Sequence, residues 1–198
     1  MFKRSFLVSL AVLFVMAQAH ASADGERPAP PPPAAPTTVL YASTGVGSVL
    51  DTPGGAAPAG TVSIRLALPL ARLFALELMG TTGYAIGRGT PDDFWARLAL
   101  GLRVEDGLRA IRPYASFRLV HLHFAPASIW EDHPGASIAG SSIEGLQHRS
   151  GMATAIGLSW AIPRTSMRAM AELEGSWVPI GNGPQWFATT ELGLGYVF

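Results

Sequence analysis

Cysteine is absent from this sequence of 198 residues. Its absence excludes disulfide bonds, catalytic thiols and thiolate metal sites together. Charge is scarce as well: Asp, Glu, Lys and Arg make up 14% of the residues, where a typical soluble domain carries about 25%. The formal net charge is zero and no basic stripe is present, so the sequence predicts no nucleic-acid partner. Such a shortage of charge is expected where much of the outer surface faces lipid.

Long apolar runs are also missing. No stretch reaches the roughly 18 to 20 consecutive apolar residues of a transmembrane helix, which disfavours a helical membrane protein. A shorter apolar run over residues 6–16 follows the basic pair Lys3 and Arg4, and small residues suited to cleavage come next at positions 19–23. We therefore predict a secretory signal peptide over residues 1–23.

A proline-rich stretch follows the predicted signal peptide. Residues 24–37 contain six prolines, which prevent both a helix and a paired strand. We expect this stretch to be an extended, polyproline-like tail or linker in the periplasm.

The stretch from Trp186 to Phe198 alternates between two kinds of residue. A period of two is typical of a β-strand whose faces meet different environments. A strand with large apolar residues toward lipid and small or charged residues toward the interior is typical of a membrane barrel. An edge strand of a soluble β-sandwich is the competing explanation. The large apolar positions are Leu192, Leu194, Tyr196 and Phe198, and Glu191, Gly193, Gly195 and Val197 lie between them.

Seven further stretches alternate in the same way, and most are about as long as the 9 to 11 residues that a tilted strand needs to cross a bilayer. Links between the stretches alternate in length, short around residues 70–72, 105–107 and 163–165, and long over 51–60, 85–93, 125–150 and 178–185. Outer-membrane barrels have short periplasmic turns and longer outside loops. The stretches lie at about 38–50, 62–69, 73–84, 94–104, 108–124, 152–162, 167–177 and 186–198.

These patterns predict an all-β fold over residues 38–198. We expect an eight-stranded antiparallel transmembrane up-and-down β-barrel with both termini in the periplasm. Its inward positions hold charges of both signs, and buried charges are tolerable only when they are paired. An eight-stranded barrel is just wide enough for side chains to fill, so we expect a side-chain-filled lumen instead of an open channel. The predicted lumen charge network is Arg65, Glu77, Arg97, Arg103, Arg112, Arg118, Arg168, Glu172, Glu174 and Glu191.

The predicted signal peptide, this architecture and the final Glu-Leu-Gly-Leu-Gly-Tyr-Val-Phe resemble small bacterial outer-membrane β-barrels of the OmpA transmembrane domain/OmpX/OmpW-like superfamily. The resemblance implies an outer-membrane location, contact with lipid and lipopolysaccharide, and insertion by the barrel assembly machinery. It also implies an assembly signal at Leu192, Leu194, Tyr196 and Phe198.

Candidate chemistry is confined to the neighbourhood of the longest predicted loop. His121 and His123 share one strand face, and carboxylates and further histidines follow at Glu131, Asp132, His133, Glu144 and His148. A divalent metal site is one interpretation, and contact with lipopolysaccharide head groups is the other. We assign no metal, no cofactor and no catalytic residue.

An enzyme of the lipid A-modifying kind would pair a serine with a histidine. Ser128, Ser141, Ser142 or Ser150 could in principle pair with His133 or His148. The His-x-Ser-Asn pattern of the barrel deacylases is missing, however, and the only asparagine is Asn182. The tryptophans Trp95, Trp130, Trp160, Trp177 and Trp186 are expected mostly near strand ends, in an aromatic girdle.

The sequence thus favours a non-enzymatic barrel that acts structurally or binds an extracellular ligand through the loop at 125–150, because loops on a rigid scaffold carry binding. A narrow channel or transporter for small hydrophobic compounds, a lipid A-modifying enzyme and a soluble periplasmic β-protein remain the alternatives.

Overall fold

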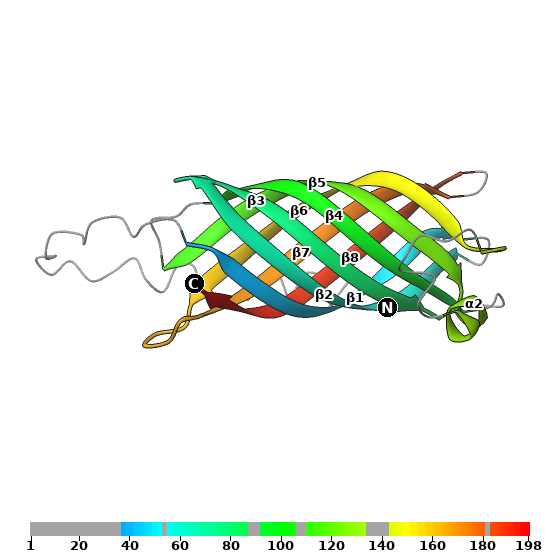
Figure 1. Cartoon of the computed structure of the whole chain (residues 1–198), viewed down its shortest axis with the longest axis horizontal. Coiled ribbons are helices and arrows are strands. Elements are labelled where there is room, and N and C mark those ends of the chain that lie inside the picture. The colour runs from blue at the N-terminus through cyan, green and yellow to red at the C-terminus, as the bar shows by residue number, and fades with distance from the viewer. Residues whose placement is uncertain (1–36, 53–54, 87–91, 106–109, 134–142, 181–182) are drawn as a thin grey trace, which may run out of the picture. The chain divides into compact units, whose positions relative to one another are not determined.

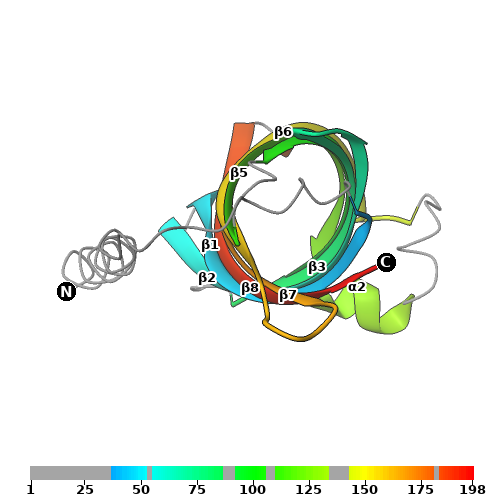
Figure 2. The same ribbon diagram turned by 90° about the vertical axis from the view of Figure 1, so that its left-hand side faces the viewer.

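A computed structural model describes residues 37–52, 55–86, 92–105, 110–133, 143–180 and 183–198. Each strand pairs in antiparallel fashion with the next, and the last strand pairs with the first, from Val39 opposite Val197 to Leu50 opposite Trp186. The result is a closed ring of eight strands (Figures 1 and 2), as predicted. The strands are β1 Val39–Thr52, β2 Gly55–Ala71, β3 Phe74–Ala85, β4 Asp93–Glu105, β5 Ile111–Pro126, β6 Gln147–Ala161, β7 Met167–Ile180 and β8 Gly183–Val197.

The outward face of the barrel is apolar. Val62, Ile64 and Leu98 are each at least 60% exposed although they lie in the middle of long paired strands. The intervening residues point inward and are buried, as the strict alternation along β5 from Tyr114 to Leu122 illustrates. The period of two in the sequence therefore corresponds to an inverted barrel, with apolar residues outside and polar residues inside.

Several strands extend further than their hydrophobic pattern indicated. β1 continues to Thr52 and β2 begins at Gly55, so most of the predicted loop 51–60 is strand. Likewise, β7 continues to Ile180 and β8 begins at Gly183, so most of the predicted loop 178–185 is strand. The strict alternation of long and short links is therefore wrong at these two places. Backbone pairing continues beyond the apolar band because a neighbouring strand satisfies the hydrogen bonds whatever the side chains are.

The predicted loop 125–150 is shortened at both ends and is partly helical. Helix α2, Ala127–Asp132, follows β5 directly and lies outside the ring in Figure 2. Its Trp130 is buried, with its ring 4.6 Å from that of Phe94 on β4. In the described part of the chain, no helix is long and apolar enough to cross a membrane.

The lumen contains an apolar cluster in addition to its charges. Trp95 is 3% exposed and packs edge-on against Phe187 with ring centroids 5.6 Å apart. Trp95 therefore points into the barrel, and its expected place in an outer aromatic girdle is wrong. Trp160 and Trp186 do lie on the outer surface. The cluster comprises Val49, Ala57, Met79, Ala85, Trp95, Ala99, Val120, Leu122, Phe124, Ala153, Val178 and Phe187.

Candidate functional site

Arg118 on β5 lies at the centre of the lumen and contacts carboxylates from two other strands. Its guanidinium forms a two-pronged contact with Glu172, with Nη1 2.9 Å from Oε1 and Nη2 2.8 Å from Oε2. Its Nε donates to Glu77 at 3.0 Å, and Nη1 also donates to Glu174 at 2.5 Å. A planar guanidinium suits such bidentate binding. One arginine therefore ties β5 to β3 and β7 through the middle of the barrel.

Glu172 on β7 accepts hydrogen bonds from side chains of two other strands, β5 and β2. Besides Arg118 it accepts from Arg65 on β2, at 2.5 Å and 2.8 Å, and from the hydroxyl of Tyr114 at 2.9 Å. Arg65, Arg118 and Glu77 are 0% exposed. The charges are thus removed from water, but opposite charges and directed hydrogen bonds compensate for the lost hydration.

Hydroxyl groups hold the fourth carboxylate. Glu191 on β8 accepts from Ser43 at 2.8 Å and from Ser63 at 2.9 Å, and Arg65 lies 3.5 Å from it. These serines were not predicted from the sequence. The alternation along β2 placed Ser63 opposite the apolar face, whereas the stretch around Ser43 was too weakly patterned to assign. A serine that alternates with apolar residues carries no sign of its partner.

The end of the barrel at the links after β2, β4 and β6 has a smaller set of contacts. Arg103 pairs with Glu105, lies 3.5 Å from Glu77 and stacks on Tyr114, with the guanidinium carbon 3.5 Å from the ring centroid. Arg112 pairs with Glu105 at 3.1 Å, and both side chains are 20% exposed. Glu105 was not among the predicted partners. Because Arg112 pairs with Glu105 and both are partly exposed, Arg112 belongs to this end of the barrel and not to the buried centre.

The remaining predicted charges lie inside as well. Arg97 pairs with Glu174 and donates to Thr81 at 3.3 Å, next to the apolar cluster. Arg168 is 5% exposed and donates to the hydroxyl of Ser159 at 3.0 Å. Chemically, this arrangement crosslinks strands and fills space.

The predicted assembly positions lie on the outside of the barrel, three of them on β8 and Phe198 directly after it. Leu192, Leu194, Tyr196 and Phe198 are each at least 50% exposed. The rings of Tyr196 and Phe198 pack edge-to-face with centroids 5.1 Å apart, and the Phe198 amide donates to the carbonyl of Thr38 at 3.0 Å. This seam closes the barrel, because β8 and β1 meet there. The role of these residues in assembly stays a prediction.

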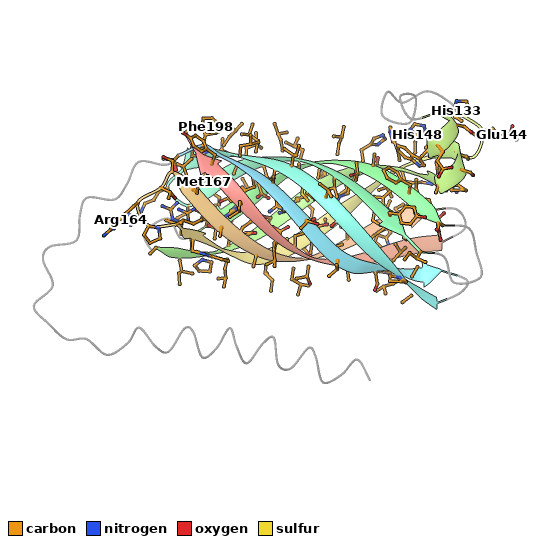
Figure 3. The ribbon with its side chains drawn as sticks, turned by 90° about the horizontal axis from the view of Figure 1, so that it is seen from below. His133, Glu144, His148, Arg164, Met167 and Phe198 are labelled. Carbon is orange, nitrogen blue, oxygen red and sulfur yellow. The ribbon has the colours of Figure 1, made fainter. Side chains whose placement is uncertain are left out.

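The histidines singled out from the sequence lie in two different places. His121, His123 and His148 come together on the outer surface of β5 and β6. His133 and Glu144 are exposed in the connecting segment, at the end of the barrel opposite Arg164, Met167 and Phe198 (Figure 3). Glu131 and Asp132 are exposed at the end of α2, and Ser141 and Ser142 lie outside the described residues.

No protein-family model matches the sequence, and no curated protein matches it. Solved structures do share the fold. Neisserial surface protein A aligns with a TM-score of 0.64 and 12% sequence identity, covering 81% of this chain and 97% of its own. The N-terminal β-barrel domain of Pseudomonas aeruginosa OprF aligns with a TM-score of 0.50 and 17% identity, covering 82% of this chain and 97% of its own. The chain therefore has the fold of small outer-membrane β-barrels.

Proposed function

We propose that this protein is an integral, non-enzymatic outer-membrane barrel that acts structurally or binds an extracellular ligand through its long connecting segment. The observation that carries the proposal is the inversion of the barrel. Leu98 is 67% exposed on the outer face, whereas Arg118 is 0% exposed within the lumen. In water this distribution would leave a wide apolar surface uncovered, and in a bilayer both groups lie in a favourable environment.

The long connection between β5 and β6 supports an orientation with both termini in the periplasm. The link between β5 and β6 spans residues 127–146, whereas the links at the other end of the barrel, after β2, β4 and β6, span only residues 72–73, 106–110 and 162–166. The links 53–54 and 181–182 are short although they lie at the same end as 127–146, so the orientation rests on the long connection alone. Short turns are typical of the periplasmic side and long connections of the outside. In this orientation residues 1–23 are the cleaved signal peptide and residues 24–37 are the periplasmic tail. The barrel assembly machinery and lipopolysaccharide are the expected partners.

The segment 127–146 is the proposed contact surface for a ligand. It is anchored on the barrel, because Trp130 and Leu146 are each 8% exposed and pack in one cluster with Ala125. Anchoring both ends on a rigid scaffold limits the entropy lost on binding. The outward residues Glu131, Asp132 and Glu144 give the described part of this surface an acidic character.

Cell fractionation and gel electrophoresis test the membrane location. The mature protein is expected in the outer-membrane fraction, to resist extraction by salt or carbonate, and to dissolve in detergent. An unheated sample should migrate differently from a boiled one, because a closed barrel resists unfolding by detergent. A protein that is freely soluble and monomeric without detergent would contradict the proposal.

Mass spectrometry of lipid A tests the non-enzymatic role separately. Lipid A from cells with and without the protein should carry the same acyl chains. An acyl-chain difference that disappears in His133→Gln or His148→Gln would overturn the non-enzymatic role and leave the membrane location intact.

A further inference from the structure

Three histidine side chains meet on the outer surface of the barrel, where β5 and β6 leave the apolar band. His121 and His123 are two residues apart on β5 and share its outward face. His148 on β6 is the direct cross-strand partner of His123. Directly opposed residues on one sheet face have Cβ atoms about 4.5 to 5.5 Å apart. The register of the barrel therefore places the third imidazole beside the other two.

The position of these imidazoles along the strands is distinctive. Outward residues on both strands stay largely apolar up to the pair Leu119 and Met152, and the next outward pair is His121 and Ser150. The two strands thus change from apolar to polar at one level. On β5 and β6 that level is the edge of the lipid-facing band, and an ion can approach from the outer aqueous side beyond it. On β4 the apolar Leu98 lies opposite His121, so the cluster borders the band on that side.

The distances between the imidazoles suit a common ion. One ring nitrogen from each of the three histidines lies within 4.8 Å of the others. The Nε2 atoms of His121 and His123 are 3.0 Å apart, and the rings of His123 and His148 have centroids 4.4 Å apart. Zinc binds histidine at about 2.0 to 2.1 Å in a tetrahedron, so two bound nitrogens lie roughly 3.3 Å apart. Small side-chain rotations are enough to reach this geometry.

The surroundings leave one side of the cluster open. His123 is 8% exposed and His121 is exposed, and both line an apolar surface groove of about 300 Å³ together with Ile64 and Leu98. Three histidine ligands with an open fourth position are the arrangement of catalytic and exchangeable zinc sites. The open position here faces the outside of the barrel.

We propose that His121, His123 and His148 bind a divalent transition-metal ion, with Zn²⁺ as the first candidate. Neutral imidazole suits Zn²⁺, Cu²⁺ and Ni²⁺, whereas Mg²⁺ and Ca²⁺ prefer oxygen ligands. The bound ion joins β5 to β6 at the base of the segment 127–146. It holds together the two strand ends that carry the proposed ligand-binding surface, and its fourth position is available to water or to an external ligand.

Calorimetric titration of the full mature protein in detergent micelles, stripped of metal with EDTA, tests the site. Zn²⁺ is expected to bind with one equivalent, and Mg²⁺ is expected not to bind under the same conditions. His121→Gln and His148→Gln should each weaken Zn²⁺ binding by at least about tenfold, since loss of even an indirect ligand partner costs 10- to 100-fold. The matched control is His133→Gln, which replaces an exposed histidine of the connecting segment 127–146 and should leave the affinity for Zn²⁺ unchanged.

The folding of each variant is checked by its heat-modifiable migration, so that a lost barrel is not mistaken for a lost site. Co²⁺ gives a second readout, because a tetrahedral complex absorbs strongly in the visible range. That band should appear in the wild-type protein and in His133→Gln and disappear in His148→Gln. The proposal is overturned if Zn²⁺ binding does not saturate, or if folded His121→Gln and His148→Gln bind as tightly as the wild type.

Discussion

The indole ring of Trp95 on β4 lies over Gly83, its direct cross-strand partner on β3. A methyl group on Gly83 would come within 2.1 Å of Trp95 Cζ2. The same relationship joins Tyr114 to Gly157 across β5 and β6, where a methyl group would lie 2.3 Å from Tyr114 Cζ. Inward glycines therefore provide the space in which large rings lie flat against the barrel wall. This arrangement lets an eight-stranded lumen hold aromatic rings as well as paired charges.

Substitution of Gly83 tests this packing. Gly83→Ala should destabilise the folded barrel by about 1 to 3 kcal/mol, because the added methyl group overpacks the interior and displaces Trp95. Urea unfolding in detergent, followed by tryptophan fluorescence, measures the change. Gly175→Ala on β7 is the control, since nothing lies within 4 Å of a methyl group there. Equal stability of the two variants would show that Gly83 has no packing role.

The sequence predicted the strands well because period two is a local property. It identified the inward face of β2 to β8, since successive residues of a strand face opposite sides, but the stretch that forms β1 was too weakly patterned to assign. It could not predict the partners. Arg65 and Glu172 are 107 positions apart in the chain, and their meeting depends on strand tilt and stagger, which alternation alone does not determine.

The histidine cluster illustrates the same limit. His121 and His123 were recognisable as a pair from their spacing on one strand. The addition of His148 depended on the register of β5 against β6 across the segment 127–146, and a register shift of one residue would have turned His148 inward. The strand extensions at Thr52 and Ile180 were missed because hydrophobicity marks only the part of a strand that faces lipid.

Removal of one lumen carboxylate should be costly. Glu172→Gln leaves Arg65 and Arg118 buried without the charge that both contact, and breaking a buried ion pair from one side costs about 3 to 5 kcal/mol. The unfolding midpoint in urea is expected to fall accordingly, or the variant should refold poorly. Glu105→Gln provides the comparison, because its side chain is 20% exposed and water can compensate. A Glu172→Gln barrel as stable as Glu105→Gln would contradict the central role of Glu172.

The contents of the lumen predict that the protein does not conduct ions steadily. The apolar cluster around Trp95 and Phe187 and the charge network around Arg118 both occupy the interior. Purified protein in planar bilayers should therefore show no persistent open level. The Trp95→Ala variant should also show no persistent open level, because the paired arginines and glutamates still fill the barrel. A stable open conductance in the wild-type protein would instead favour the narrow-channel alternative.

Substitution of Phe198 distinguishes a role in assembly in the cell from a contribution to the stability of the folded barrel. Its side chain is 68% exposed and packs against Tyr196, so Phe198→Ala should change the unfolding free energy of refolded protein by less than about 1 kcal/mol. If the machinery that inserts the barrel recognises this position, the amount of heat-modifiable protein in the outer membrane should nevertheless fall several-fold. Leu100→Ala removes a comparable apolar side chain, 48% exposed on the same outer face, and should assemble normally. Equal membrane levels of the two variants would mean that Phe198 acts as one more lipid-facing residue and carries no assembly signal.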